Sequence, residues 1–462
     1  MNFADLRFWQ IFLTGLVLWL AVRKLAMFGG LKWRGDRLVL ATLSLSLLLA
    51  VGWKTLLIFL YVALLTYFAL FFGREWRVPE RLLLWLLVPL QVAPLLYYKY
   101  GDFVGNSILH LHRPELTQLV IPVGISFYTF QKISFVIDTL HFRKPIPPFL
   151  DYLNYASFFP QIVAGPIERR ESLLPQVSRF QLKFKLANLG EGLPWIILGF
   201  FFKCGLADNL ADSFPSAPAD NAYFIWYANL LFGFRIYFDF AGYSLIALGL
   251  ARCLGVSLTL NFRSPYCAVN MADFWHRWHV SLSQWFRDYL YIPLGGGRGV
   301  RWWFNILLVF VISGIWHGAG WNFILWGFLH GLFLVAYRIC PFSLPLAVGR
   351  LVTLTAAIFS WLFFYETDSQ LLLRKTISLL SPQTYGFAEM AAVAKLFARP
   401  EGLLSLVFVG ISLVVIGLEA RSVRNKAEPY EFFFHPWVLV LLIIFTVWMA
   451  PGKTNAFIYF AF

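Results

Sequence analysis

The sequence predicts an all-α integral membrane protein that crosses the bilayer many times. The 462 residues are 59% hydrophobic and only 13% charged, with a mean hydropathy of +0.67, whereas a soluble domain has about 25% charged residues. Apolar runs recur along the whole chain, and no long polar stretch separates them into soluble domains. Because the bilayer interior offers backbone groups no water, these runs are expected to be helices.

The twelve apolar runs predict eleven or twelve spans in a single membrane domain over residues 1–462. Several runs are short or interrupted by Gly and Pro, which favours an internal chamber that covers the freed backbone groups. The first run is followed by Arg23 and Lys24, with no small-residue cleavage site, so we expect a retained span. The runs are 8–22, 38–52, 56–73, 82–98, 117–137, 188–203, 223–250, 303–316, 321–339, 350–365, 403–419 and 436–450.

Charge and cysteine content argue against a nucleic-acid-binding protein and against a cysteine metal site. The net charge of +14 comes from short Lys and Arg clusters between apolar runs. These clusters form no basic domain face, so we expect a lipid bilayer as partner and no nucleic acid. The four cysteines show no CxxC pair and no metal-ligand spacing, so we expect buried side chains and no bound metal.

The distribution of basic residues predicts the orientation. Basic clusters follow the first, third and fifth runs, so these loops are expected to be cytoplasmic, with the N-terminus outside. The loop with Asp208, Asp212 and Asp220 is acidic and is placed outside. No internal repeat is visible, which weakens a transporter interpretation based on inverted repeats.

The segment from Asn270 to Arg301 predicts an amphipathic helix in the membrane interface or along a cavity. One stripe is aromatic and apolar, and the opposite stripe carries His276, His279, Ser283 and Arg287. A membrane-surface anchor is the alternative, although an anchor would more naturally carry Lys on its polar face. The following glycine run, 295–299, favours a turn over a phosphate-binding loop because no strand precedes it.

His317 is the strongest single candidate for chemistry. It lies at the end of an apolar run, between Trp316 and Gly318, where an ionisable residue is a functional hypothesis by default. A neutral histidine there suits a general base that activates a hydroxyl acceptor against a thioester. The alternatives are a core histidine bonded to a backbone carbonyl, or a metal site with His276 and His279.

Two segments, 274–296 and 313–331, resemble the signature of bacterial membrane-bound O-acyltransferases, most closely the alginate O-acetylation branch. They read FWHRWHVSLSQWFRDYLYIPLGG and SGIWHGAGWNFILWGFLHG. Segments 122–139, 154–170, 234–252 and 261–266 resemble the same branch. The resemblance covers about residues 85–340, the expected catalytic core, and leaves 341–462 as C-terminal transmembrane helices.

The resemblance implies a ring of transmembrane helices around a central tunnel, with short re-entrant and interfacial helices. It implies that His317 is catalytic and that His279 is the second functional histidine. No cofactor is expected; the donor would be acetyl-CoA or an acyl-carrier thioester. The implied partners are a periplasmic acetyltransferase and an acyl carrier protein, at the bacterial inner membrane. His276 stands where the family usually has arginine, which puts a donor contact there in doubt.

Several other residues are expected near the substrate or donor without acting in catalysis. They are Arg277, Trp278, Ser283, Arg287, Asp288, Asn305 and Trp316. Asp239, inside an apolar run, needs a partner, and Arg235 is the nearest in sequence.

The predicted function is O-acetylation of an extracytoplasmic polysaccharide such as alginate. The alternatives within the family are D-alanyl transfer to teichoic acid and O-acetylation of peptidoglycan. A transporter without chemistry is the alternative from another class, and the sparse intramembrane charge counts against it.

Overall fold

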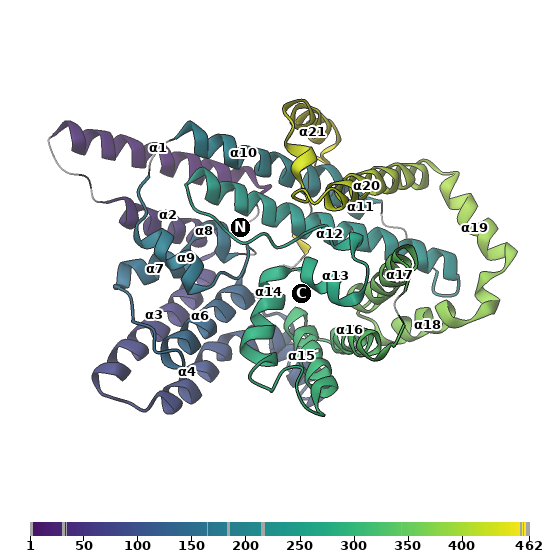
Figure 1. Ribbon diagram of the computed structural model, residues 1–462, viewed down its shortest axis with the longest axis horizontal. Helices are drawn as coiled ribbons and strands as arrows, with labels where there is room; N and C mark the ends of the chain where they lie inside the picture. Colours follow the sequence, from purple (N-terminus) through teal and green to yellow (C-terminus); the bar gives the residue numbers. More distant parts are fainter. Residues whose placement is uncertain are drawn as a thin grey trace. The chain divides into compact units, whose positions relative to one another are not determined.

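The computed structural model describes residues 3–29, 33, 35–163, 165–182, 185–213, 218–342, 344–452, 455 and 457–458. Within these ranges every regular element is a helix, as Figure 1 shows. The chain forms two compact units, Met1–Ile196 with Tyr243–Thr259, and Ile197–Gly242 with Leu260–Phe462. The long helices α10 (Leu186–Phe200) and α12 (Ala222–Cys253) contribute to both units. The predicted all-α membrane fold is confirmed.

The first unit contains the N-terminal helices. They are α1 (Leu6–Phe28), α2 (Asp36–Val51), α3 (Trp53–Glu75), α4 (Glu80–Leu95), η1 (Leu96–Tyr100), η2 (Phe103–Ile108), α5 (Pro114–Thr117), α6 (Ile125–Leu140), α7 (Phe149–Ser157), α8 (Phe159–Ile162) and α9 (Arg170–Ser178). Helix α6 is buried along nearly its whole length, so this unit has its own core.

The second unit contains the histidines singled out above. Its helices are η3 (Phe201–Ala207), α11 (Asp208–Asp212), η4 (Pro265–Cys267), α13 (Met271–Arg277), α14 (Val280–Phe286), η5 (Arg287–Tyr291), α15 (Trp302–His317), α16 (Trp321–Ile339), α17 (Leu346–Tyr365), α18 (Ser369–Leu380), η6 (Pro382–Tyr385), α19 (Phe387–Phe397), α20 (Pro400–Arg424), η7 (Glu431–Phe434) and α21 (Pro436–Met449).

Each of the twelve predicted apolar runs contains a helix, although residues 118–124 of the run 117–137 lie outside one, and the helices differ in length. Among the described residues, eight helical segments are long and apolar enough to cross a membrane, which makes the chain a multi-pass membrane protein. The other four runs form the shorter helices α2, α6, α15 and α21. Eight described helices, and not the expected eleven or twelve, are therefore long enough to span the membrane. The sequence overestimated the number because a helix buried in lipid and one buried in protein can have similar hydropathy.

Two of the long helices contain prolines and continue as π-helices, in agreement with the Gly- and Pro-interrupted runs of the sequence. Helix α4 contains Pro89 and Pro94 and continues as the π-helix η1. Helix α10 contains Pro194 and continues as the π-helix η3, whose residues are all buried. A proline frees the carbonyl four residues earlier, and π-turns are frequent at functional sites.

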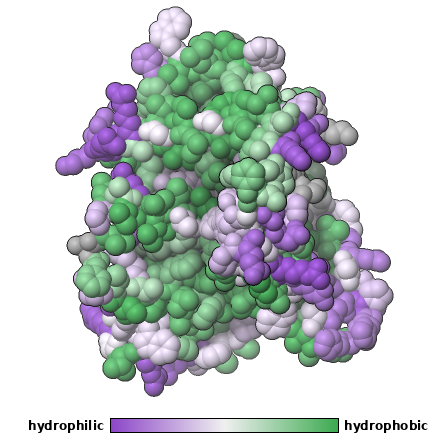
Figure 2. Space-filling model, turned by 90° about the vertical axis from the view of Figure 1, so that its right-hand side faces the viewer, coloured by the Kyte–Doolittle hydropathy of each residue, from purple (hydrophilic) through white to green (hydrophobic). Residues whose placement is uncertain are grey.

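The outer surface around α17 to α20 is largely apolar, as Figure 2 shows. Leu351, Leu403 and Val414 are each at least 59% exposed there. A surface of this kind is favourable in contact with lipid tails and unfavourable in contact with water. One expectation about the cysteines is wrong: Cys340 is exposed, while Cys204 and Cys267 are buried.

Candidate active site

His317 is the last residue of α15 and is only 2% exposed. Its ring lies edge-on to Trp326, with 5.0 Å between centroids, and 5.4 Å from the ring of Phe364. Helix α15 ends here because Gly318 is extended, and a Cβ at Gly318 would lie 2.1 Å from the ring of Phe323. The helix end therefore holds the imidazole against aromatic rings.

His279 lies between α13 and α14 and is fully buried. Its backbone has φ +42° and ψ +56°, the left-handed region that non-glycine residues rarely adopt. Asn261 holds this turn, because its carbonyl accepts the Val280 N–H at 2.9 Å. Burial lowers the pKa of the His279 imidazole to about 3, so the ring is neutral near pH 7.

The two histidines predicted to be functional contact the same tryptophan. The Trp316 ring centroid lies 6.0 Å from that of His279 and 4.9 Å from that of His317. Residues 38 positions apart in sequence are thus brought to one place in the second unit. A neutral imidazole such as that of His279 offers one nitrogen that donates and one that accepts, which is the requirement for moving a proton from a hydroxyl.

A third buried histidine, His330 on α16, extends this cluster. Its Nε2 lies 2.8 Å from Oγ of Ser360 on α17. The Trp326 ring contacts both His330 and His317, with centroid distances of 4.7 Å and 5.0 Å. Sequence reasoning missed His330, although it is an ionisable residue inside an apolar run, the same signal that selected His317.

The predicted continuous amphipathic helix over 270–301 is wrong. The chain instead forms α13 and α14, separated at Trp278 and His279, and then the π-helix η5. His276 and His279 were predicted to lie on the same polar face of one helix. Because of the break they differ in environment: His276 is exposed, while His279 is buried. Helical periodicity did not reveal the break because nothing in the local pattern specifies a left-handed histidine.

The residues expected near the donor occupy two kinds of position. Trp278 is buried and stacks on Phe274, with 5.6 Å between centroids, and Ser283 Oγ donates to the Trp278 carbonyl at 3.2 Å. Ion pairs hold the charged members: Arg277 Nε lies 2.7 Å from Asp273 Oδ1, and Arg287 Nε lies 2.7 Å from Asp288 Oδ1.

A mostly apolar cavity of about 390 Å³ lies beside the histidine cluster, within the second unit. Ser283 and Arg287 line it, together with His276. Val280 and Ser313 also line it; Val280 follows His279 directly, and Ser313 lies one helical turn before His317. The lining therefore includes residues close in sequence to both central histidines but neither imidazole itself. The size of the cavity suits a small acyl group with part of its carrier.

The glycine run forms a turn, as predicted. Gly295, Gly296 and Gly299 all have positive φ. The Asn305 side-chain amide donates to the carbonyls of Leu294 and Gly296, each at 3.1 Å. Asn305, expected near the substrate, is thus placed where it stabilises this turn.

The predicted pairing of Asp239 with Arg235 is wrong. Lys203 Nζ lies 2.7 Å from Asp239 Oδ1 and 2.8 Å from Asp208 Oδ1, and all three side chains are at most 3% exposed. The Ile458 N–H also donates to Asp239, at 2.7 Å. Asp208, expected in an acidic outer loop, is therefore part of a buried ion cluster. A partner 36 positions away in sequence lies beyond what local spacing predicts.

A second buried acid was also missed. Glu419 on α20 is fully buried and accepts a hydrogen bond from the Tyr237 hydroxyl at 2.7 Å. The Tyr430 hydroxyl donates to the carbonyl of Phe262 at 3.2 Å, and the Phe262 ring packs edge-on against Trp278. This polar network thus supports the segment that precedes His279.

The hairpin that carries His317 depends on close contact between α15 and α16. A Cβ at Gly327 would lie 2.2 Å from the carbonyl oxygen of Phe310, and one at Gly314 would lie 2.2 Å from that of Phe323. Gly327→Ala is therefore expected to lower the free energy of unfolding by about 1–3 kcal/mol, the cost of overpacking. Thermal unfolding of the purified protein in detergent measures this loss.

Gly410→Ala is the matched control, because a Cβ at Gly410 in α20 meets no atom within 4 Å. That substitution should leave stability unchanged or raise it slightly, since alanine favours helix. Equal melting temperatures for the two variants would contradict the close approach of α15 and α16.

The fold and the site define a multi-pass helical membrane protein with buried histidines beside an apolar cavity. Comparison of the sequence with known families gives a match to MBOAT, the membrane-bound O-acyltransferase family, over residues 140–373. The match covers half of the chain and includes His279 and His317. This chain belongs to the membrane-bound O-acyltransferase family.

The curated relatives include acetyl- and alanyltransferases. The chain is 36% identical to a peptidoglycan O-acetyltransferase of Helicobacter pylori, over 61% of this chain and 62% of the relative. It is 32% identical to the probable alginate O-acetylase AlgI of Pseudomonas aeruginosa, over 69% and 64%. It is 30% identical to a teichoic acid D-alanyltransferase of Bacillus subtilis, over 54% and 66%. The matches therefore span about three fifths of the first two relatives' length.

Proposed function

We propose that this protein takes an acetyl group from a cytoplasmic thioester, acetyl-CoA, and delivers it across the bacterial inner membrane for O-acetylation of an extracytoplasmic polysaccharide such as alginate. The observation that carries the proposal is the pair of buried histidines around Trp316, inside the region that matches the family. Support for acetyl as the acyl group comes from the two relatives named as acetylating enzymes.

In this proposal His317 acts as the general base. An imidazole nitrogen of His317 accepts the proton of the acceptor hydroxyl while the hydroxyl oxygen attacks the thioester carbonyl. The carbon–sulfur bond then breaks, and the thiolate leaves and takes up a proton. His279, neutral because of its burial, orients the substrate or relays the proton. A periplasmic acetyltransferase passes the group on to the polymer.

The donor test uses purified protein in nanodiscs. Radiolabelled acetyl-CoA is supplied with an oligosaccharide acceptor, and free CoA and labelled acceptor are both measured. CoA release that requires intact His317 supports the proposal. Activity with a D-alanyl carrier protein and none with acetyl-CoA would favour D-alanyl transfer to teichoic acid. Absence of thioester cleavage with either donor, once the periplasmic partner is added, would favour a transporter.

Peptidoglycan is the second candidate acceptor, and a specific observation favours it: 36% identity to a peptidoglycan O-acetyltransferase. Parallel reactions with peptidoglycan fragments and with alginate oligosaccharides, each with the matching periplasmic acetyltransferase, separate the two polymers. Label in the muropeptide fraction alone would replace alginate by peptidoglycan in the proposal.

His279→Asn tests the second histidine without disturbing its backbone. Asparagine tolerates the left-handed conformation that His279 adopts, so the substitution removes the imidazole alone. We expect acetyl transfer to fall by about 10²-fold, the cost of misplacing a reacting group. His279→Ala should show the same loss and a lower melting temperature, because alanine is strained there. Unchanged transfer in His279→Asn would leave His279 without a catalytic role.

A further inference from the structure

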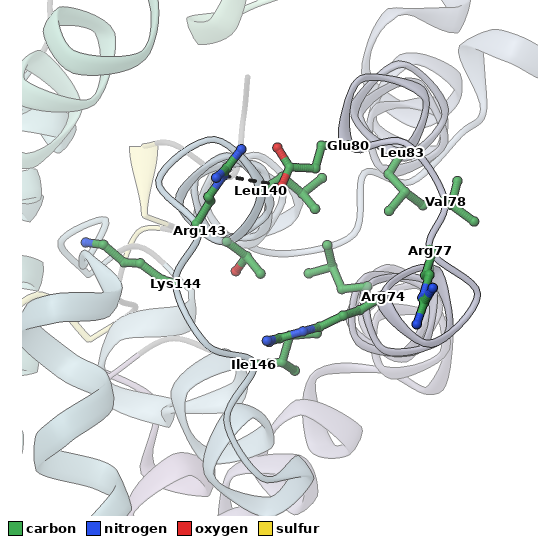
Figure 3. A pocket seen from close by; sticks show the side chains of 12 residues that line it. Arg74, Arg77, Val78, Glu80, Leu83, Leu140, Arg143, Lys144 and Ile146 are labelled. Atoms are coloured by element: carbon green, nitrogen blue, oxygen red, sulfur yellow. Dashed lines mark ion pairs between the residues drawn. The ribbon is translucent and has the colours of Figure 1, made fainter.

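A basic pocket in the first unit lies outside the histidine cluster and has no role in the proposed reaction. It has a volume of about 380 Å³ and opens between the end of α3, the start of α4 and the end of α6. Its lining includes four basic residues and one acidic residue, shown in Figure 3: Arg74, Arg77, Arg143, Lys144 and Glu80. The basic excess predicts an anionic ligand.

Two of the four basic side chains are already engaged by carboxylates. Lys144 forms an ion pair with Glu171, and Figure 3 shows its side chain pointing away from the opening. Arg143 Nε lies 3.8 Å from Oε1 of Glu80, and both side chains are more than half exposed, so this pair is weak. Arg74 extends from α3 toward Ile146 on the other side of the opening. The described residues contain no carboxylate partner for Arg74 or Arg77.

The backbone conformation of two of these arginines is unusual for a residue with a side chain. Arg77 has φ +53° and Arg143 has φ +51°, both in the left-handed region. Helix α3 ends in a motif in which the Val78 N–H donates to the Gly73 carbonyl at 2.8 Å and the Arg77 N–H donates to that of Arg74 at 3.2 Å. Glycine is the usual residue at the position of Arg77 in this motif. Strain of this kind concentrates at ligand sites.

The surroundings favour a lipid over a soluble anion. Trp76 and Phe142, beside the arginines in sequence, are 73% and 57% exposed, as expected for side chains at the headgroup depth of a bilayer. Leu70, Leu83 and Leu140 give the pocket an apolar wall. The basic rim suits the phosphate of a phospholipid, and the apolar wall suits its glycerol and acyl chains.

We propose that this pocket binds the phosphate of an anionic phospholipid in the cytoplasmic leaflet, with Arg74 and Arg143 as its direct contacts. Basic residues at the cytoplasmic ends of α3 and α6 follow from the predicted orientation, and pockets of this kind on the cytoplasmic side recognise anionic headgroups. Arg77 adds charge at the rim. The proposal is independent of the acyl-transfer chemistry.

The test measures binding of fluorescent phosphatidylglycerol to the purified protein in neutral detergent. The double variant Arg74→Gln/Arg143→Gln is expected to bind about tenfold more weakly or worse, given the contribution of each basic residue near a membrane surface. Arg421→Gln/Arg424→Gln is the matched control, because it removes two exposed charges from the end of α20. The control should bind as the wild type does.

Glu80→Gln gives a change of opposite sign, so a folding defect cannot imitate the result. It removes the acidic residue of the lining and releases Arg143, and tighter phosphatidylglycerol binding is expected. Equal affinity of the wild type and the Arg74/Arg143 variant would overturn the site. Equal binding of phosphatidylcholine would overturn its charge selectivity. Displacement of the lipid by inorganic phosphate at constant ionic strength would reassign the pocket to a free anion.

Discussion

Replacing His317 with alanine is expected to lower acetyl transfer by about 10²–10⁴-fold, the usual contribution of a positioned general base. The imidazole is 2% exposed, ends α15 and is held by the rings of Trp326 and Phe364, so no water or neighbouring group replaces it easily. Release of CoA and transfer of label should fall together, because both require the same step. Initial rates with labelled acetyl-CoA in nanodiscs measure the loss.

Two controls separate chemistry from folding. His435→Ala removes an exposed histidine at the start of α21 and should retain wild-type activity. His317→Gln keeps hydrogen-bonding capacity of similar size but cannot accept the proton, so it should be as inactive as His317→Ala. A monodisperse, thermally stable His317→Gln protein with normal acetyl-transfer rates would remove His317 from the mechanism.

The fold was predictable to the extent that hydropathy determines it. Each of the twelve apolar runs contains a helix, because a segment in lipid must satisfy its backbone internally. Length separated the eight spans from α2, α6, α15 and α21. Hydropathy alone did not make this separation for α15 and α21, which are as apolar as spans but shorter. Helix α6 is buried in protein along most of its length and includes the buried polar residues Gln131, Lys132 and Asp138.

The candidate site was predictable in its residues but not in its geometry. His279 and His317 were chosen from short motifs, and the structure brings both against Trp316. The break at His279 could not be predicted because a left-handed residue depends on Asn261, 18 positions away, which holds the turn. The partner of Asp239 was missed for the same reason, since Lys203 comes from another helix.

His330 and Glu419 were missed although their signal was present. Both are ionisable residues in or at the end of apolar runs, and both are fully buried with hydrogen-bond partners on other elements, Ser360 and Tyr237. Applying the rule for intramembrane polar residues to every run, and not only to the family motifs, would have found them.

Replacing Lys203 with methionine is expected to lower the free energy of unfolding by about 3–5 kcal/mol, because it leaves buried carboxylates without their cation. Lys203 is 2.7 Å from Asp239 and 2.8 Å from Asp208, and the three side chains are at most 3% exposed. Methionine preserves much of the volume of the lysine side chain. The loss of unfolding free energy therefore reflects the missing charge and not a change in packing. Unfolding in mixed detergent and sodium dodecyl sulfate, followed by tryptophan fluorescence, measures it.

A compensated variant distinguishes loss of charge balance from loss of the lysine itself. Lys203→Met/Asp208→Asn/Asp239→Asn removes the whole ion cluster, while the amide that replaces the Asp239 carboxylate retains an acceptor for the Ile458 N–H. Its stability should recover most of the loss, since neutral groups of similar shape carry no uncompensated charge. Lys375→Met, which breaks a less buried one-to-one pair with Glu366, should cost less. If the triple variant were as unstable as Lys203→Met, packing around Lys203 and not its charge would hold η3 in place.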